Sequence, residues 1–432
     1  MALIAIDLTP LLPGGVNGGV KFLALELVRA FQASDKNHKL LILTASWNHE
    51  LLSDLDAPNT ERLCILDKTE ETVSLEVPAP QSYLNGSLTR AFYILPDGIR
   101  KRLLSLGLPQ KCASIIVKFR RALESNSQEK IPAKGVLSER KTDVLFCPFT
   151  APTFAEPGIP TICLVCDLQH RDYPQFFLPE EISTRESFYK KVAGKANAII
   201  CISEFTRKSV IEHLGTRPER THSIPICVHD RLSISEPNDI VTHLRTLKID
   251  AFPYMFYPAN FWPHKNHALL ITAYGIFVSN NPGKHLDLVL TGALDGAQQE
   301  LKERVRCMGL EDRVHFLGYL SDKELAAVWQ GSSFLIFPSL YEGFGIPVLE
   351  SMRFGKPVLC SNVTSLPEVA GDAALYFDPR KPFEITECME RLSSDRQLHS
   401  DLVRRGYDNL RRFRAQEMTD AYLRHIEAVI RP

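Results

Sequence analysis

The stretch SFLIFPSLYEGFGIPVLESMRFGKPV, residues 333–358, decides the fold class of this chain. It begins with a short apolar run typical of a buried strand, continues with a glycine-rich loop, and predicts a helix from near Pro347 to Gly355. Glycines let the backbone approach a ligand closely, and the free N–H groups at a helix start attract anions. The stretch therefore predicts an anion site at the carboxyl edge of a parallel sheet, where open α/β folds bind ligands.

Similar apolar runs recur on both sides of this stretch, between helical segments. Before residue 250 they are ALIAID, LLILTA, RLCILD, DVLFCP, PTICLVCD and NAIICIS, and after it YMFYPA, LDLVLTG, VHFLGY, SFLIFPS, KPVLCS and ALYFD. Near-continuous apolar strands alternating with helices indicate parallel sheets covered on both faces. We therefore predict an α/β chain of two doubly wound domains, residues 1–235 and 250–410, with the polar stretch from Arg231 to Phe252 as the linker.

Composition limits the function classes. The 432 residues are 44% hydrophobic, enough for more than one core, and 50 Lys and Arg against 51 Asp and Glu leave no global field for binding nucleic acid. No apolar run approaches the roughly 18 residues of a spanning helix, and the start MALIAIDLTP lacks the basic region of a secretory signal. The ten cysteines lack the spacing of a disulfide framework. We expect a cytoplasmic protein with reduced core cysteines and no nucleic-acid partner.

A basic stretch from Asp97 to Thr142 fits the alternation poorly. Eleven Lys or Arg against four acids give it a local charge of about +7, and Leu, Ile, Val and Phe are interspersed among the cations. This pattern suits an amphipathic helix on anionic lipid at the inner face of a membrane, and equally an ordinary solvated insertion. Both interpretations stay open.

Two carboxylates flank the glycine-rich loop eight positions apart, Glu342 on the loop and Glu350 in the predicted helix. A carboxylate beside a phosphate site is costly unless it accepts hydrogen bonds from hydroxyls, as a ribose or a sugar ring would offer. The combination indicates a nucleotide sugar. For either glutamate alone, a solvated acid stabilised by the helix dipole is the simpler interpretation.

The segments PSLYEGFGIPVLESM and SNVTSLPEVAGDAALYFDP resemble the family 4 glycosyltransferases, retaining enzymes of the GT-B fold, in which two Rossmann-like domains face each other across a cleft. Glu342 and Glu350 match the E-x7-E motif of that family. The resemblance implies that Glu350 binds the ribose hydroxyls of the donor. It also implies that Glu342 and the backbone of Gly343, Phe344 and Gly345 meet the transferred sugar and the diphosphate.

A second segment, YPANFWPHKNHALLITAY, places Lys265 just before a helix, where a cation can neutralise a diphosphate leaving group. Lys265 matches the phosphate lysine of the family, whereas Asn260 stands where an Arg is more usual and offers only a neutral hydrogen bond. His264 and His267 have a spacing that metal ligands use, but no third ligand is in view. The D-x-D triplet at 54–56 lies in a polar stretch, so we expect neither a metal nor another cofactor.

Two segments of the first domain complete the predicted site. By resemblance, Gly18 and Gly19, in the turn after the first strand, face the donor diphosphate across the cleft, and the last helix, 411–432, crosses back onto the first domain. Asp167 and His170 follow a buried strand, where they can bind an acceptor or move its proton, or serve as a capping Asp and a packing His. The family usually has a His directly before this Asp, and here Cys166 takes that place.

Two helix starts show capping patterns. Ser203 is placed to cap the helix that follows the strand NAIICI. Ser365 and Glu368 have the S-x-x-E spacing of a capping box.

We therefore expect a retaining, metal-independent transferase with Glu342, Lys265, Asp167 and His170 as catalytic candidates. It would move a hexose of mannose, rhamnose or glucose type from a nucleotide-diphosphate sugar to a glycan or lipid-linked acceptor in cell-surface polysaccharide synthesis, lipopolysaccharide included. The alternatives are a nucleotide-sugar epimerase or phosphorylase on the same fold, and a non-catalytic GT-B binding protein.

Overall fold

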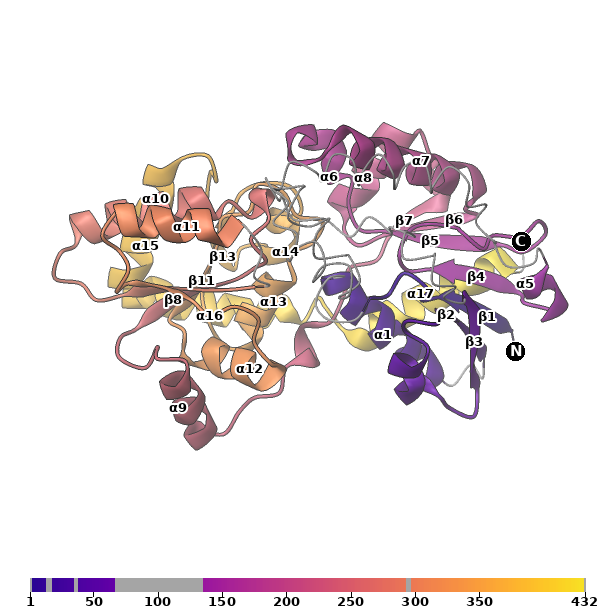
Figure 1. Ribbon diagram of the computed structural model, residues 1–432, viewed down its shortest axis with the longest axis horizontal. Coiled ribbons are helices and arrows are strands. Elements are labelled where there is room, and N and C mark those ends of the chain that lie inside the picture. Colours follow the sequence, from indigo (N-terminus) through magenta and orange to yellow (C-terminus); the bar gives the residue numbers. More distant parts are fainter. Residues whose placement is uncertain (1, 13–17, 35–37, 67–134, 293–296, 431–432) are drawn as a thin grey trace, which may run out of the picture.

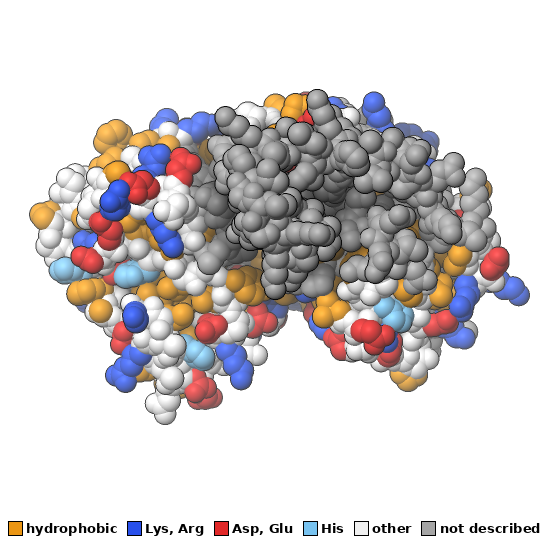
Figure 2. Space-filling model, in the orientation of Figure 1, with side chains coloured by type: hydrophobic (Ala, Val, Ile, Leu, Met, Phe, Trp, Pro, Cys, Tyr) orange, Lys and Arg blue, Asp and Glu red, His pale blue; other side chains and the backbone are white. Residues whose placement is uncertain are grey.

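The computed structural model describes residues 2–12, 18–34, 38–66, 135–292 and 297–430. These residues form two parallel sheets, each lying between helices, in two lobes that sit side by side (Figure 1). Most of the basic stretch, residues 97–134, lies outside the described residues, so its two interpretations stay open. On the face shown in Figure 2, both lobes carry Lys or Arg beside Asp or Glu, consistent with the near-zero net charge.

The first sheet has seven strands in the order β3-β2-β1-β4-β5-β6-β7, and every neighbouring pair is parallel. The strands are β1 (Leu3–Asp7), β2 (Lys39–Ala45), β3 (Thr60–Leu66), β4 (Val144–Cys147), β5 (Thr161–Val165), β6 (Ala198–Cys201) and β7 (Thr221–Ser223). Among the described residues, the helices of this domain are α1 (Gly19–Gln32), α5 (Val136–Glu139), α6 (Gln169–Asp172), α7 (Pro179–Lys195) and α8 (Glu204–Leu214). Short 3-10 turns lie at η1 (Glu50–Leu55), η3 (Pro174–Phe176), η4 (Pro218–Arg220) and η5 (His229–Arg231).

The second sheet has six strands in the order β10-β9-β8-β11-β12-β13, again all parallel. The strands are β8 (Tyr254–Pro258), β9 (Asp287–Thr291), β10 (Val314–Phe316), β11 (Phe334–Phe337), β12 (Val358–Ser361) and β13 (Ala374–Phe377). The described helices around this sheet are α9 (Pro237–Thr246), α10 (His267–Asn280), α11 (Ala297–Cys307), α12 (Asp322–Gly331), α13 (Ile346–Arg353), α14 (Leu366–Ala370), α15 (Pro382–Ser394) and α16 (Arg396–Leu410), with the turn η6 (Pro263–Lys265) after β8. The last helix is α17 (Ala415–Ile430).

The predicted fold class is confirmed, for the physical reason that suggested it. The interior strands β5 and β9 are buried along their whole length, because helices cover both faces of each sheet. All twelve apolar runs named from the sequence form strands. The additional strand, β7, has only three residues, Thr-His-Ser, too short and too polar to give an apolar signal.

The predicted linker is wrong in part. Within it, residues Pro237–Thr246 form α9, which packs on α12, and Gln330 of α12 exchanges two hydrogen bonds with the backbone of Ser235. Leu244 and Leu247 lie against the hydrophobic core. Four apolar residues at helical spacing, from Ile240 to Leu247, were a signal for this helix in a segment that otherwise reads as polar.

The last helix, α17, lies along the first domain next to α1 and β4, although α16 before it packs on the second domain (Figure 1). Tyr422 of α17 is buried, and its ring meets Phe146 of β4 edge-on with 5.8 Å between centroids. The sulfur of Met418 accepts a hydrogen bond from the backbone N–H of Cys227. The chain thus passes between the domains a second time near its end.

The described cysteines are all free, and most are buried as expected, but Cys307 is exposed. In the ranges that the structure describes, no helix combines the length and the apolar character needed to cross a membrane.

Candidate functional site

The site is built on the loops that follow β8 and β11, two neighbouring strands of the second sheet. Parallel strands end at the same sheet edge, so these two loops lie together. The hydroxyl of buried Tyr257 donates to the carbonyl of Lys265 at 2.8 Å, and Leu340 N–H donates to the carbonyl of His264 at 2.7 Å. Asn266, at a positive φ of 61°, donates from its side chain to Pro338 and Pro379 carbonyls. These bonds fix Lys265 beside the second loop.

Lys265 and Glu342 form an ion pair across the two loops, with 2.5 Å between Nζ and Oε1. Their side chains are only 13% and 11% exposed, so the pair is nearly desolvated and its Coulomb interaction is stronger than it would be in water. The backbone N–H of Glu342 donates to the hydroxyl of Thr364 at 3.1 Å, which orients the loop. The structure thus brings together the two residues that the sequence assigned to the diphosphate and the sugar.

The loop from Gly343 to Gly345 leads into α13, as predicted. Gly345 caps the helix at a φ of 101°, and a Cβ there would lie 2.6 Å from the side chain of Leu366. Phe344 points into the core, where its ring meets Phe413 edge-on. The helix thus begins four residues after Glu342, so the positive end of its dipole lies at this loop. Among its first three residues, Pro347 has no N–H, and the N–H of Val348 donates to the carbonyl of Gly345 at 3.0 Å.

The glycine turn of the first domain approaches this helix start from the other side. A Cβ on Gly19 would lie 2.6 Å from Cδ1 of Ile346, the first residue of α13. Gly18, at a φ of 55°, caps α1. Because Gly19 carries no side chain, the turn contacts the start of α13 there, whereas a Cβ added to Gly18 would meet no heavy atom within 4 Å. That Gly18 and Gly19 face the donor diphosphate stays a prediction.

Glu350, one turn into α13, is 2% exposed, and burial raises the pKa of its carboxyl. Arg231, from the segment that joins the domains, opposes this shift because its Nε lies 2.8 Å from Oε1. Glu350 is therefore not the solvated helix-start acid of the simpler interpretation. Asn260, half-buried in the loop after β8, accepts a backbone hydrogen bond from Trp262 at 2.9 Å.

Asp167 and His170 differ in their surroundings. Asp167 is half-buried after β5, and its carboxylate accepts a hydrogen bond from the N–H of Gln169. The imidazole of His170 is buried, stacks on Tyr189 and lies 2.9 Å from a carboxylate oxygen of Glu186. Burial, followed by the charge of Arg185, lowers the pKa of His170. The geometry favours the packing interpretation for His170 and leaves Asp167 nearer the domain interface.

The first domain also contacts the glutamate loop directly. Ser203, which caps α8 as predicted, donates from its hydroxyl to the carbonyl of Gly343 at 2.7 Å. A Cβ on Gly343 would lie 2.1 Å from the carbonyl oxygen of Cys166, so only glycine allows this approach. Tyr341 is buried between the domains, and its hydroxyl accepts a hydrogen bond from the N–H of Leu168. These contacts hold the loop against the end of β5.

The predicted capping box at Ser365 and Glu368 is wrong. The hydroxyl of Ser365 donates to the carbonyls of Glu342 and Phe344 rather than capping its own helix. The carboxylate of Glu368 accepts the first two N–H groups of α8, at 2.8 and 3.0 Å, across the domain interface. Both side chains thus bond to residues outside α14, whose five residues span Leu366–Ala370.

The described residues contain no group of three or more His, Cys, Asp or Glu that could hold a metal ion. His267 is buried between the rings of Tyr257 and Phe261, and burial lowers its pKa to about 3. The acids at 54 and 56 are exposed and pair with arginines of their own domain.

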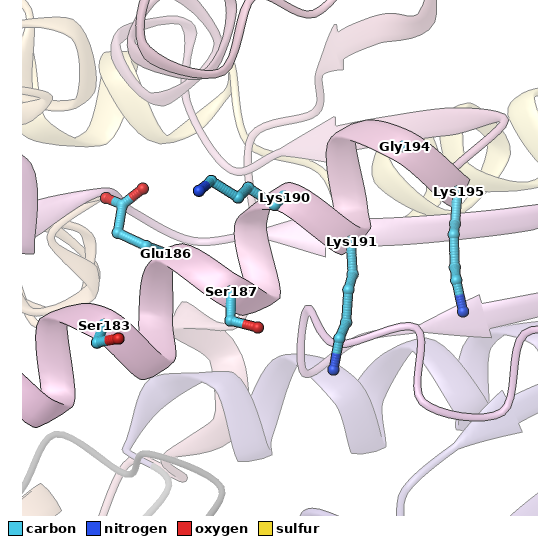
Figure 3. Close-up of a pocket in the computed structure, with 7 residues that line it drawn as sticks. All are labelled: Ser183, Glu186, Ser187, Lys190, Lys191, Gly194 and Lys195. Atoms are coloured by element: carbon cyan, nitrogen blue, oxygen red, sulfur yellow. The ribbon is translucent and has the colours of Figure 1, made fainter.

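A shallow hollow runs along α7 (Figure 3). It is lined by Ser183, Glu186, Ser187, Lys190, Lys191, Gly194 and Lys195. Its three lysines are exposed, and Lys191 and Lys195 point to the same side of the helix. None of the predicted site residues lines it, so we regard it as a solvated helix face.

Residues 243–409, which carry the Lys265–Glu342 pair, α13 and Glu350, match the family model "Glycosyl transferases group 1". The second domain belongs to the group 1 glycosyl transferases. Solved structures are similar to the whole chain and place it in the GT-B fold. The Anabaena protein Alr3699/HepE in complex with UDP and glucose has a TM-score of 0.67 and 16% identity over 99% of this chain and 100% of the other. WaaG, a glycosyltransferase involved in lipopolysaccharide biosynthesis, has a TM-score of 0.63 and 14% identity over 97% and 98%.

Sequence relatives of this chain include two Escherichia coli proteins. O-antigen chain mannosyltransferase B is 29% identical over 206 residues, 48% of this chain and 54% of the relative. Serotype-specific mannosyltransferase WbdA is 30% identical over 250 residues, 56% of this chain and 30% of the relative. The chain thus spans about half of the first relative and about a third of the second.

The sequence analysis did not predict four contacts, which are made by the side chains of Arg231, Glu368, Ser203 and Tyr341. For Glu368 and Ser203 the residues were noticed, but each was assigned only a local capping role. Arg231 was interpreted only as the first residue of a polar linker. The partners of all four lie more than 100 positions away in the chain, so local spacing carries no signal for the contacts.

Proposed function

We propose that the chain is a retaining, metal-independent hexosyltransferase. It moves a hexose of mannose, rhamnose or glucose type from a nucleotide-diphosphate sugar to a glycan or lipid-linked acceptor in cell-surface polysaccharide synthesis. The observation that carries this proposal is the nearly desolvated Lys265–Glu342 pair in the loops next to the start of α13. Gly19 of the first domain contacts that helix start. A cation, a helix start and a carboxylate in one place suit a diphosphate bonded to a sugar.

In this proposal, catalysis consists mainly of positioning and of stabilising the leaving group. Lys265 Nζ and the positive end of the α13 dipole take up the charge that develops on the diphosphate as the sugar–phosphate bond breaks. Glu342 accepts hydrogen bonds from sugar hydroxyls, and Glu350 accepts them from the ribose. Closure of the two domains excludes water and brings the acceptor hydroxyl to the anomeric carbon.

The acceptor side of the proposed reaction is the carboxyl end of β5. Cys166 touches the glutamate loop there, and the half-buried Asp167 follows it. We assign acceptor binding to Asp167 and a packing role to His170, whose imidazole is engaged by Glu186. No protein base is required if the departing phosphate removes the acceptor proton, as in the front-face displacement discussed for the family that the sequence resembles.

The named relatives support the choice of sugar and pathway. Both Escherichia coli relatives are mannosyltransferases, one of them of O-antigen chains, which favours mannose and a lipopolysaccharide or related acceptor. The basic stretch 97–142 motivates a further part of the proposal, contact with anionic lipid at the inner membrane face. Sedimentation with anionic liposomes tests that part, and absence of binding at low salt contradicts it.

The experiment that tests the proposal is a thermal-shift screen of nucleotide sugars that differ in base and hexose, followed by product analysis with the best donor. A bound donor raises the melting temperature with its concentration. Lys265→Met should lower kcat about 100-fold or more, the range seen for loss of one charge-stabilising donor. Lys323→Met, which removes an exposed lysine of α12, is the matched control and should leave kcat unchanged.

The outcomes separate the alternatives. An epimerase converts the labelled donor without an acceptor, a phosphorylase requires free phosphate, and a non-catalytic protein binds the donor without turnover. Unchanged transfer by Lys265→Met removes Lys265 from the mechanism. If no nucleotide sugar shifts the melting temperature or is turned over, the proposed function is wrong.

A further inference from the structure

Glu350 is held by one arginine that joins three elements. Besides its 2.8 Å contact with Glu350, Arg231 places Nη1 3.3 Å from Oδ1 of Asp322, at the start of α12. Its guanidinium carbon lies 4.5 Å from the ring centroid of Phe22, in α1 of the first domain. Arg231 is 19% exposed at the side chain and Glu350 is 3% exposed, so the pair is largely removed from water. Arg231 therefore lies between the helix of the first domain and the carboxylate of the second.

The charge state of Glu350 depends on this contact. A buried carboxyl without a cation tends to take up a proton, and burial already raises the pKa of Glu350. Three neighbouring groups also act on this pKa. Arg231 and the indole of Trp329 lower it, and the charge of Asp322 raises it. The neighbouring Arg353 of α13 pairs with Asp230, at 2.7 Å.

An ionised carboxylate can accept about four hydrogen bonds, and its bonds with hydroxyls are stronger than those of a neutral acid. The Nε contact of Arg231 uses one oxygen, Oε1, and leaves acceptor capacity for ligand hydroxyls. A protonated Glu350 would lose part of this capacity. The affinity of a vicinal diol that binds to Glu350, such as a ribose, would therefore depend on Arg231.

We propose that Arg231 is a positioning residue for the nucleotide sugar: it keeps Glu350 ionised and oriented toward the donor ribose. Because its guanidinium lies against Phe22, the arrangement is complete when the two domains are in contact. This inference rests on the proposed function and adds a residue from the interdomain segment to the donor site. Arg231 acts through Glu350 and does not itself touch the reacting atoms.

The test is the KM for the donor as a function of pH in Arg231→Gln and Arg231→Lys. In the Gln variant we expect KM to rise as the pH falls, about tenfold per pH unit below the raised pKa of Glu350, because only the ionised form binds well. The Lys variant keeps the charge and should return most of the wild-type profile. The KM for the acceptor and the kcat at saturating donor should change little, since the lost interaction is made already in the ground state.

Two variants control for structural damage. Arg353→Gln removes the neighbouring contact between α13 and η5 without touching Glu350, so it should keep the wild-type pH profile. The double variant Arg231→Gln/Glu350→Gln has no unpaired buried charge, so it should fold even if Arg231→Gln does not, and its donor KM should not depend on pH. A wild-type profile in Arg231→Gln, or a pH-dependent KM in the double variant, overturns the inference. If wild-type protein turns over no nucleotide sugar, the proposed function fails instead.

Discussion

Replacing Gly343 with alanine should block the close contact between the glutamate loop and Cys166 of the first domain, while each domain stays folded. The added Cβ would lie 2.1 Å from the carbonyl oxygen of Cys166, whereas contacts of real Cβ atoms are essentially never shorter than 3.0 Å. Backbone faces the new methyl group, so the loop and the end of β5 must separate by about 0.9 Å. The same movement stretches the 2.7 Å hydrogen bond from Ser203 to the carbonyl of Gly343.

A displacement of this size at a reacting centre costs on the order of 100-fold in rate. We therefore expect kcat of Gly343→Ala to fall about 100-fold with the preferred donor, while the melting temperature stays near that of the wild type. Donor affinity, measured by calorimetry, should change much less, because Lys265, Glu342 and Glu350 all belong to the second domain.

Gly194→Ala is the matched control. Gly194 lies in α7, and no heavy atom lies within 4 Å of an added Cβ. This substitution should leave kcat unchanged and stabilise the helix by about 0.5 to 1 kcal/mol. Wild-type kcat in Gly343→Ala would show that the reactive state does not require the close approach of Gly343 to Cys166, and would refute the reasoning.

Two further predictions concern the domain interface and the last helix. Glu368→Gln weakens the cap that the second domain places on α8, which should cost about 1 kcal/mol and lower kcat/KM about fivefold. Its control is Glu384→Gln, which weakens a carboxylate contact to the backbone N–H of Asp378 within the second domain and should leave kcat/KM unchanged. The stacked rings of His222 and His425 join β7 to α17, and burial, followed by the charge of His222, lowers the pKa of His425 from 6.5 to about 4. The unfolded chain therefore takes up a proton on His425 at higher pH than the folded chain does. The contribution of His425 to the free energy of unfolding is complete above about pH 6.5 and is lost as the pH falls toward 4. The melting temperature of His425→Gln should drop less between neutral and mildly acidic pH than that of the wild type, and an equal drop in both would contradict the assignment.

The periodicity of apolar residues was enough to predict both sheets. Runs such as ICLV and FLIF are apolar at every position, which only a strand buried on both faces requires, and the structure confirms each of them. Apolar periodicity did not predict elements whose residues are mostly polar. β7 is a polar edge strand of three residues, and α9 carries four apolar residues in a segment dominated by polar ones.

The candidate site was predictable as a set of residues but not as an arrangement. The E-x7-E spacing and the glycines identified Glu342 and Glu350, and the position before a helix identified Lys265. Their partners were not predictable: Lys265 and Glu342 stand 77 positions apart, and Arg231 and Glu350 stand 119 apart. The S-x-x-E pattern at Ser365 was misleading, since a capping box assumes that near neighbours in sequence are the best partners.

By itself, the sequence determined the properties that depend on neighbouring residues: which segments are strands, where glycine lets a helix start meet a ligand, and which side chains sit on the loops between. Tertiary structure alone decided which of those loops share a sheet edge, which charges are buried, and which cation each buried carboxylate meets. The physical reason is that burial and pairing depend on distances set by the whole fold. Those distances are fixed only once the parallel strands have brought remote segments together at one edge and the two domains have closed on each other.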